Sequence, residues 1–119
     1  MYTVAGARET LAALLPTLDQ IVALRADTAE LAAAVTSGAA TTLGGTPEFK
    51  AAQARLDELI TDLQQQDVQV KGLAPLLLDF PSEIDGVPVL LCWLEGDRAL
   101  SWYHRTDLGF AGRRPLPAG

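Results

Sequence analysis

The sequence predicts an α+β fold in which a long antiparallel helical hairpin packs with a three-stranded antiparallel β-meander. Over residues 1–67 the apolar side chains recur at helical spacing. Over residues 68–119 they form short runs separated by turn-forming residues, which is typical of strands. A chain of 119 residues can bury one core. We therefore expect a single domain over 1–119, with the hairpin at 1–67 and the meander and C-terminal tail at 68–119.

The first helix is predicted to begin after Thr3, whose hydroxyl can cap it, and to cover residues 6–15. Pro16 then predicts a kink or the first turn of a second helix, because proline cannot donate the backbone hydrogen bond. Downstream, apolar positions spaced three or four apart form one continuous helical face. Its members are Leu14, Leu18, Ile21, Leu24, Thr28, Leu31 and Val35.

A segment rich in glycine, serine and threonine at residues 37–45 predicts the break between the helices. Thr46-Pro47-Glu48 provides three signals that favour a helix start, and Gln64-Gln65-Gln66-Asp67 marks its expected end. The wide apolar and alanine surface over residues 11–35 predicts self-association of the chain through its long helices, as a homodimer.

Three strands are predicted at residues 76–80, 87–94 and 99–104. Asp85-Gly86 fits a two-residue hairpin turn, which needs positive φ at both positions. Glu95-Gly96-Asp97-Arg98 is expected to form the second hairpin loop as a four-residue connection.

These turns predict a register, and the register predicts which side chains share a face. The first turn pairs Phe80 with Leu91 and Leu78 with Trp93. The second loop pairs Trp93 with Leu100, Leu91 with Trp102, and Val89 with His104. One face, expected to pack on the helices, then carries Leu78, Phe80, Leu91, Trp93, Leu100, Trp102 and His104. Asp79 and Cys92 fall on the other face, away from His104, so Cys92 is expected to be an inert buried thiol.

Composition excludes several classes of function. Fifteen acidic residues outnumber nine basic ones, for a net charge of -6, and no extended basic stripe is present, so we expect no nucleic-acid binding. No apolar run is long enough to span a membrane, and no signal peptide is apparent. Cys92 is the single cysteine, which suits a reducing cytoplasm. One cysteine and one histidine exclude a conventional Cys/His zinc site within one chain, so no metal or other cofactor is expected.

The C-terminal third carries the most distinctive motifs. They are Cys92-Trp93, the Glu95-Gly96 turn, Trp102-Tyr103-His104, and the run Asp107-Leu108-Gly109-Phe110-Ala111-Gly112-Arg113-Arg114-Pro115. With Leu78-Asp79-Phe80-Pro81 and the opening Tyr2-Thr3, they resemble the bacterial domain-of-unknown-function family 2203 over nearly the whole chain. Gly6 and Tyr103 depart from that pattern, where relatives usually have a glutamate and a tryptophan directly beside the histidine. The resemblance implies no particular activity or cofactor.

The candidate ligand-binding residues are His104, Asp107, Arg113, Trp93 and Glu95. His104 is the natural base or ligand of the set, and Asp107 lies near enough in sequence to orient its ring. Residues 109–114 fit either an anion site, with Arg113 and turn donors, or a structural latch. In the latch, Asp107 caps the turn, Gly109 supplies positive φ and Phe110 fills the core. No catalytic residue is assigned, because no nucleophile is in register with His104.

Three functions are consistent with these observations. The first is a small cytoplasmic structural or interaction protein acting as a homo-oligomer. The alternative is a binding module for a small anionic metabolite at the C-terminal His/Asp/Arg motif. A second alternative is a metal-assisted enzyme that uses His104, Asp107 and Glu95.

Overall fold

A computed structural model describes residues 1–39 and 41–117. Ala40 in the predicted interhelical break, and Ala118 and Gly119 at the end of the predicted tail, lie outside the described residues. The chain divides into two compact units. One contains Met1–Leu14 and Leu63–Gly119, and the other contains Leu15–Asp62. The candidate site lies entirely within the first unit.

Two helices account for the N-terminal half of the chain: α1 spans Val4–Ser37 and α2 spans Thr46–Gln65. Thr3 caps α1 as predicted, since its Oγ1 accepts a hydrogen bond from the Gly6 amide at 2.9 Å. α1 continues through Pro16, so no second helix starts there. None of the described helices combines the length and apolar character that a membrane crossing requires. Antiparallel pairing of α1 with α2 stays a prediction.

The unit of residues 15–62 has an aliphatic core drawn from the predicted helical faces. Its buried members are Leu18, Ile21, Leu31, Leu56 and Leu59. At the start of α2, Glu48 accepts a hydrogen bond from the Gly45 amide at 3.1 Å, which satisfies a donor that the helix leaves free.

The other unit contains a five-stranded antiparallel sheet in the order β1-β2-β3-β4-β5. The strands are β1 (Gln69–Leu73), β2 (Leu76–Ile84), β3 (Val87–Leu94), β4 (Trp102–Arg105) and β5 (Arg114–Pro115). The predicted number of three strands is therefore wrong, although the α+β class is confirmed. β1 was not predicted because a bulge between Val70 and Gly72 interrupts the alternation of apolar and polar side chains along the strand. β5 has only two residues, and its pairing with β4 is a tertiary contact.

The β2–β3 hairpin confirms the predicted first turn. Asp85 and Gly86 have φ values of 51° and 78°, as a two-residue turn of this kind requires. Phe80 pairs with Leu91 and Leu78 pairs with Trp93, as predicted.

The predicted register between the second and third strands is wrong by one residue. Leu91 pairs with Tyr103 and Leu90 with His104. The connection between β3 and β4 runs from Glu95 to Ser101, because β4 begins only at Trp102. Contacts remote in sequence fix this longer loop, among them a hydrogen bond from Arg8 Nε to the Leu100 carbonyl at 3.2 Å. The shift moves His104 and Trp102 to the opposite face of the sheet.

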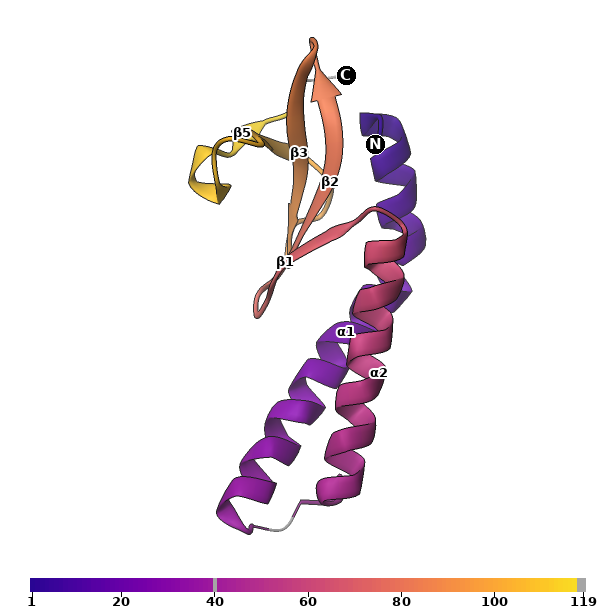
Figure 1. Ribbon diagram of the computed structural model, residues 1–119, viewed down its shortest axis with the longest axis vertical. Helices are drawn as coiled ribbons and strands as arrows, with labels where there is room; N and C mark the ends of the chain where they lie inside the picture. The colour runs from indigo at the N-terminus through magenta and orange to yellow at the C-terminus, as the bar shows by residue number, and fades with distance from the viewer. Residues whose placement is uncertain (40, 118–119) are drawn as a thin grey trace. The chain divides into compact units, whose positions relative to one another are not determined.

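The sheet consequently has two different faces. The helix face carries Leu78, Phe80, Val89, Leu91, Trp93 and Tyr103, and the tail face carries Leu77, Asp79, Leu90, Cys92, Trp102 and His104. On the helix face, the Tyr2 ring packs edge-on against Phe80 at 5.4 Å between ring centroids. On the tail face, residues 106–115 fold back over the sheet through a short 3-10 turn at Phe110–Gly112. Figure 1 shows the N-terminal end of α1 and the β5 segment on opposite sides of the sheet.

Candidate functional site

Three side chains that bear ligand atoms meet on the tail face: Asp79 from β2, Cys92 from β3 and His104 from β4. Asp79 is directly opposite Cys92 in the ladder, and His104 is opposite Leu90, two residues from Cys92. Their exposed fractions are 2%, 0% and 5%. One carboxylate oxygen, the sulfur and one ring nitrogen all lie within 4.8 Å of one another. Burial of three such groups together is costly unless they have a common partner.

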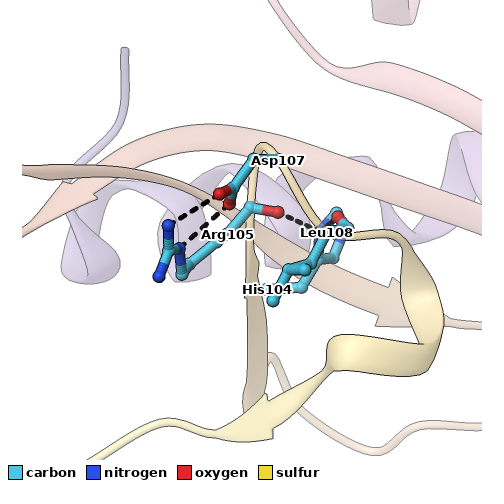
Figure 2. A network of polar contacts seen from close by, with 4 residues as sticks. All are labelled: His104, Arg105, Asp107 and Leu108. Carbon is cyan, nitrogen blue, oxygen red and sulfur yellow. Dashed lines mark hydrogen bonds and ion pairs between the residues drawn. The ribbon is translucent and has the colours of Figure 1, made fainter.

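The C-terminal tail fixes the ring of His104. Its Nδ1 lies 2.9 Å from the carbonyl oxygens of both Arg105 and Leu108. Figure 2 shows the dashed contact from the Arg105 carbonyl. Carbonyl oxygens only accept hydrogen bonds, so Nδ1 must carry a proton. The neutral imidazole therefore has its lone pair on Nε2, the nitrogen that faces the cluster.

His104 Nε2 points at Asp79 Oδ2, 3.3 Å away. An ionised carboxylate also only accepts, so a proton or a metal cation must lie between the two atoms for the contact to be favourable. The second carboxylate oxygen, Asp79 Oδ1, is buried and has no hydrogen-bond partner within the described part of the chain. A fully buried oxygen with an unused lone pair is unusual in a native core.

Cys92 is in an environment that holds the free sulfur as a neutral thiol. Burial raises the pKa of Cys92 from its ordinary value of 9.0 to about 11, and the charge of Asp79 acts in the same direction. Hydrogen bonding and positive charge from Arg113 act in the opposite direction. The thiol is consequently a poor nucleophile at neutral pH, whereas a bound metal ion would replace its proton.

Arg113 holds the tail against the sheet. Its guanidinium carbon lies 4.4 Å from the centroid of the Trp102 ring and 4.6 Å from that of Phe110, within cation–π range of both. An ion pair joins Arg113 to Asp97 at 3.6 Å. These contacts support the latch, but two details predicted for it are wrong. Gly109 has a φ of -85°, and Phe110 is 42% exposed rather than in the core.

A cavity of about 340 Å³ adjoins the cluster beneath the tail. Asp79 and His104 form part of its wall, so the cluster faces this space directly. The remaining wall comes from β1, β2, β3 and the tail: Lys71, Leu77, Leu90, Thr106, Asp107, Leu108, Gly109 and Phe110.

Asp107 does not orient His104, contrary to the prediction. Both of its carboxylate oxygens accept from Arg105, at 2.9 and 2.6 Å, and Figure 2 shows the carboxylate directed at that guanidinium. The turn that it occupies nevertheless carries the Leu108 carbonyl that holds the imidazole. The ligand-binding role of Asp107 stays a prediction.

Trp93 and Glu95 lie apart from the cluster and support the β3–β4 loop. The Trp93 side chain is on the helix face and donates from Nε1 to the Asp97 carbonyl at 3.1 Å. Glu95 accepts from the Leu76 amide at 2.9 Å. Of the five predicted site residues, only His104 belongs to the cluster.

Sequence reasoning missed Asp79 and Cys92 as partners of His104. The predicted register placed His104 on the other face, and the one-residue shift brings the three together. A signal was available, because Asp79 is a charged residue inside an otherwise apolar run, Leu76-Leu77-Leu78-Asp79-Phe80. A carboxylate that a strand buries in such a run needs a partner.

The fold and site define a small α+β protein with a buried Asp/Cys/His cluster on one face of its sheet, closed by an arginine-held tail. The chain belongs to the family described as "Uncharacterized conserved protein (DUF2203)", whose model matches residues 1–116. That match confirms the resemblance seen in the sequence motifs. No curated protein matches the chain. Comparison with solved structures likewise finds no match.

Proposed function

We propose that this protein binds a divalent transition-metal ion through Asp79, Cys92 and His104. The observation that carries the proposal is the imidazole, whose Nδ1 is committed to two carbonyl acceptors while Nε2 faces a carboxylate. Metal-ligating histidines are held in this way, by a hydrogen bond from the other ring nitrogen to an outer acceptor. A cation at this point would satisfy Nε2 and the carboxylate together.

The separations of the ligand atoms suit a small metal ion. Nitrogen and oxygen ligands about 2.1 Å from a tetrahedral metal are about 3.4 Å apart, and Nε2 lies 3.3 Å from Asp79 Oδ2. The Cys92 sulfur lies within 4.8 Å of both atoms, so a small movement of the sulfur toward them would complete the set of three ligands. The unpartnered Asp79 Oδ1 supplies a further oxygen lone pair.

Zinc is the ion that this ligand set favours. It accepts thiolate, imidazole and carboxylate ligands together, whereas magnesium and calcium prefer oxygen ligands alone. Three protein ligands leave a fourth position open, which is typical of catalytic rather than structural zinc sites. In such a site the metal acts as a Lewis acid toward a bound water or carbonyl oxygen.

Metal titration of the full chain tests the proposal. We expect the chelator-treated protein to bind one equivalent of Zn²⁺, and Co²⁺ to give visible d–d bands with a thiolate-to-cobalt charge-transfer band. Cys92→Ser should abolish the charge-transfer band, and His104→Gln should weaken binding by about 100-fold or more. Asp107→Asn is the matched control, because Asp107 lies close by but is paired with Arg105, and it should bind as the wild type does.

Two results would overturn the metal proposal. One is a folded wild-type chain, verified by circular dichroism, that shows no thiolate-to-cobalt band. The other is equal metal affinity in the wild type, Cys92→Ser and His104→Gln. Asp79→Asn, the least disruptive change in shape, keeps the test valid if the other variants fail to fold, since it too should weaken binding.

Self-association through α1 is a separate proposal. Leu15 of this helix is a large apolar side chain that is 46% exposed, and a second copy of the chain would cover it. Light scattering at tens of micromolar should give the mass of a dimer. The Leu15→Glu variant should give the mass of a monomer, and a monomeric wild type would refute the proposal.

A further inference from the structure

The cavity beside the cluster has one apolar side and one cationic residue, in addition to the two proposed metal ligands. Leu77, Leu90, Leu108 and Phe110 provide the apolar wall, and Lys71 is the cationic residue. We propose that this cavity binds a small carboxylic acid with an apolar body, whose carboxylate takes the open metal position and pairs with Lys71. This inference rests on the proposed metal site and names the class of ligand that completes it.

Lys71 reaches the cavity because β1 contains a bulge. Val70 pairs with Leu78 and Gly72 with Leu77, which leaves Lys71 as the extra residue without a partner in the ladder. Bulges redirect a side chain in this way and occur often beside functional sites. The Lys71 side chain makes no ion pair or hydrogen bond with the other described residues, so its ammonium is available to an incoming anion.

The other charges around the cavity leave Lys71 unopposed. The Asp107 carboxylate also lies at the wall, but Arg105 neutralises it through two short hydrogen bonds. The charges of a bound divalent cation, the Cys92 thiolate and the ionised Asp79 carboxylate sum to zero. The loaded wall would then have one net positive charge, from Lys71, which matches a monoanion.

The apolar wall of the cavity favours a carboxylic acid over a phosphate as the ligand. A phosphate dianion needs several donors around its oxygens, as helix N-termini and arginine clusters provide. Among the described side chains of the wall, Lys71 is the only cation, while four residues are apolar. A carboxylate needs fewer donors, and its hydrocarbon part can bury apolar surface.

Cobalt-loaded protein gives a direct test with phenylacetate as the probe. Phenylacetate should shift the d–d bands saturably, whereas phenylacetamide, its neutral analogue, and inorganic phosphate should have at least about tenfold weaker effects. Lys71→Gln should weaken the phenylacetate response at least about tenfold and leave the cobalt spectrum unchanged. Lys50→Gln, which removes the other lysine of the chain from α2, should match the wild type.

The possible failures are distinguishable. A normal cobalt–thiolate spectrum that phenylacetate does not change would overturn the ligand proposal alone. Equal responses to phenylacetate and phenylacetamide would also overturn it, as would a response to phosphate alone. Unaltered phenylacetate binding in Lys71→Gln would overturn it too. Absence of the cobalt–thiolate spectrum in wild-type protein would instead overturn the metal proposal, together with the inference that rests on it.

Discussion

The two faces of the sheet have the same strands and nearly equal burial, yet they have opposite chemistry. The helix face buries Leu78, Phe80 and Leu91 completely, and the ring of Tyr2, which precedes α1, packs edge-on against Phe80. The tail face buries Asp79, Cys92 and His104 beneath a tail that an arginine holds in place. Adjacent residues of one strand, such as Asp79 and Phe80, therefore serve different purposes.

This contrast indicates that the helix face is the one that stabilises the fold. Each large apolar side chain buried on the helix face contributes about 1.5–3 kcal/mol. Burial of a carboxylate and an imidazole contributes little on balance, because the cost of removing charged groups from water offsets their mutual attraction. A buried cluster of this kind is consequently better explained by ligand binding than by stability.

Truncation on the helix face should have the largest effect on stability. Phe80→Ala removes a fully buried ring and should lower the free energy of unfolding by about 3–5 kcal/mol. Urea unfolding measures this loss, which should be equal with and without Zn²⁺ if the variant still folds. A loss that depended on Zn²⁺ would show that the two faces are coupled and do not have separate roles.

The pH dependence of stability tests the environment of Cys92 on the tail face. The folded pKa of about 11 lies above the ordinary 9.0, so the unfolded chain loses the thiol proton first as pH rises. Stability from this group is complete below pH 9 and is lost between pH 9 and 11, by about 2–3 kcal/mol.

Urea unfolding of metal-free protein in the presence of a chelator measures that loss against Cys92→Ala. The wild type should lose more stability than the variant over this pH range. Parallel pH profiles for the two proteins would contradict the buried, thiol-favouring environment.

A smaller effect is expected where the tail packs on itself. A Cβ added at Gly112 would lie 2.9 Å from the Leu108 Cβ, and the Leu108 carbonyl holds the His104 ring. Gly112→Ala should cost about 1–2 kcal/mol in metal-free protein and weaken Zn²⁺ binding by about 10-fold or more, as loss of an outer-shell contact does. Isothermal titration calorimetry measures the affinity.

Gly45→Ala is the control for that substitution. An added Cβ at Gly45 would have no neighbour within 4 Å, and this glycine lies in the other unit. It should leave the affinity for Zn²⁺ unchanged. Equal affinities in the wild type and Gly112→Ala would show that the tail does not position His104.

The predictable parts of the fold depend on interactions close in sequence. Apolar spacing located both helices, and Thr3 was correctly predicted to cap α1, because a helix and its cap are local. Asp85-Gly86 set the β2–β3 register, since a two-residue turn leaves a single alignment. β1 and β5 were missed, because a bulged strand and a two-residue strand have no regular alternation.

The candidate site was only partly predictable, through His104 and the C-terminal tail. Its other two members depend on the alignment of β3 with β4, which a seven-residue connection leaves open. That alignment is held by contacts far apart in the chain, such as Arg8 with the Leu100 carbonyl. A shift of one residue exchanges the faces of a strand, so the site could not be assembled from the local sequence.

The α+β class, the two helices, the β2–β3 hairpin and the family were predictable from the sequence alone, because these depend on local periodicity, turn chemistry and motifs. The position of His104 beside Asp79 and Cys92 depends on tertiary contacts. The physical reason is that side chains alternate along a strand, and the partner strand and the tail choose which side of the sheet each residue faces.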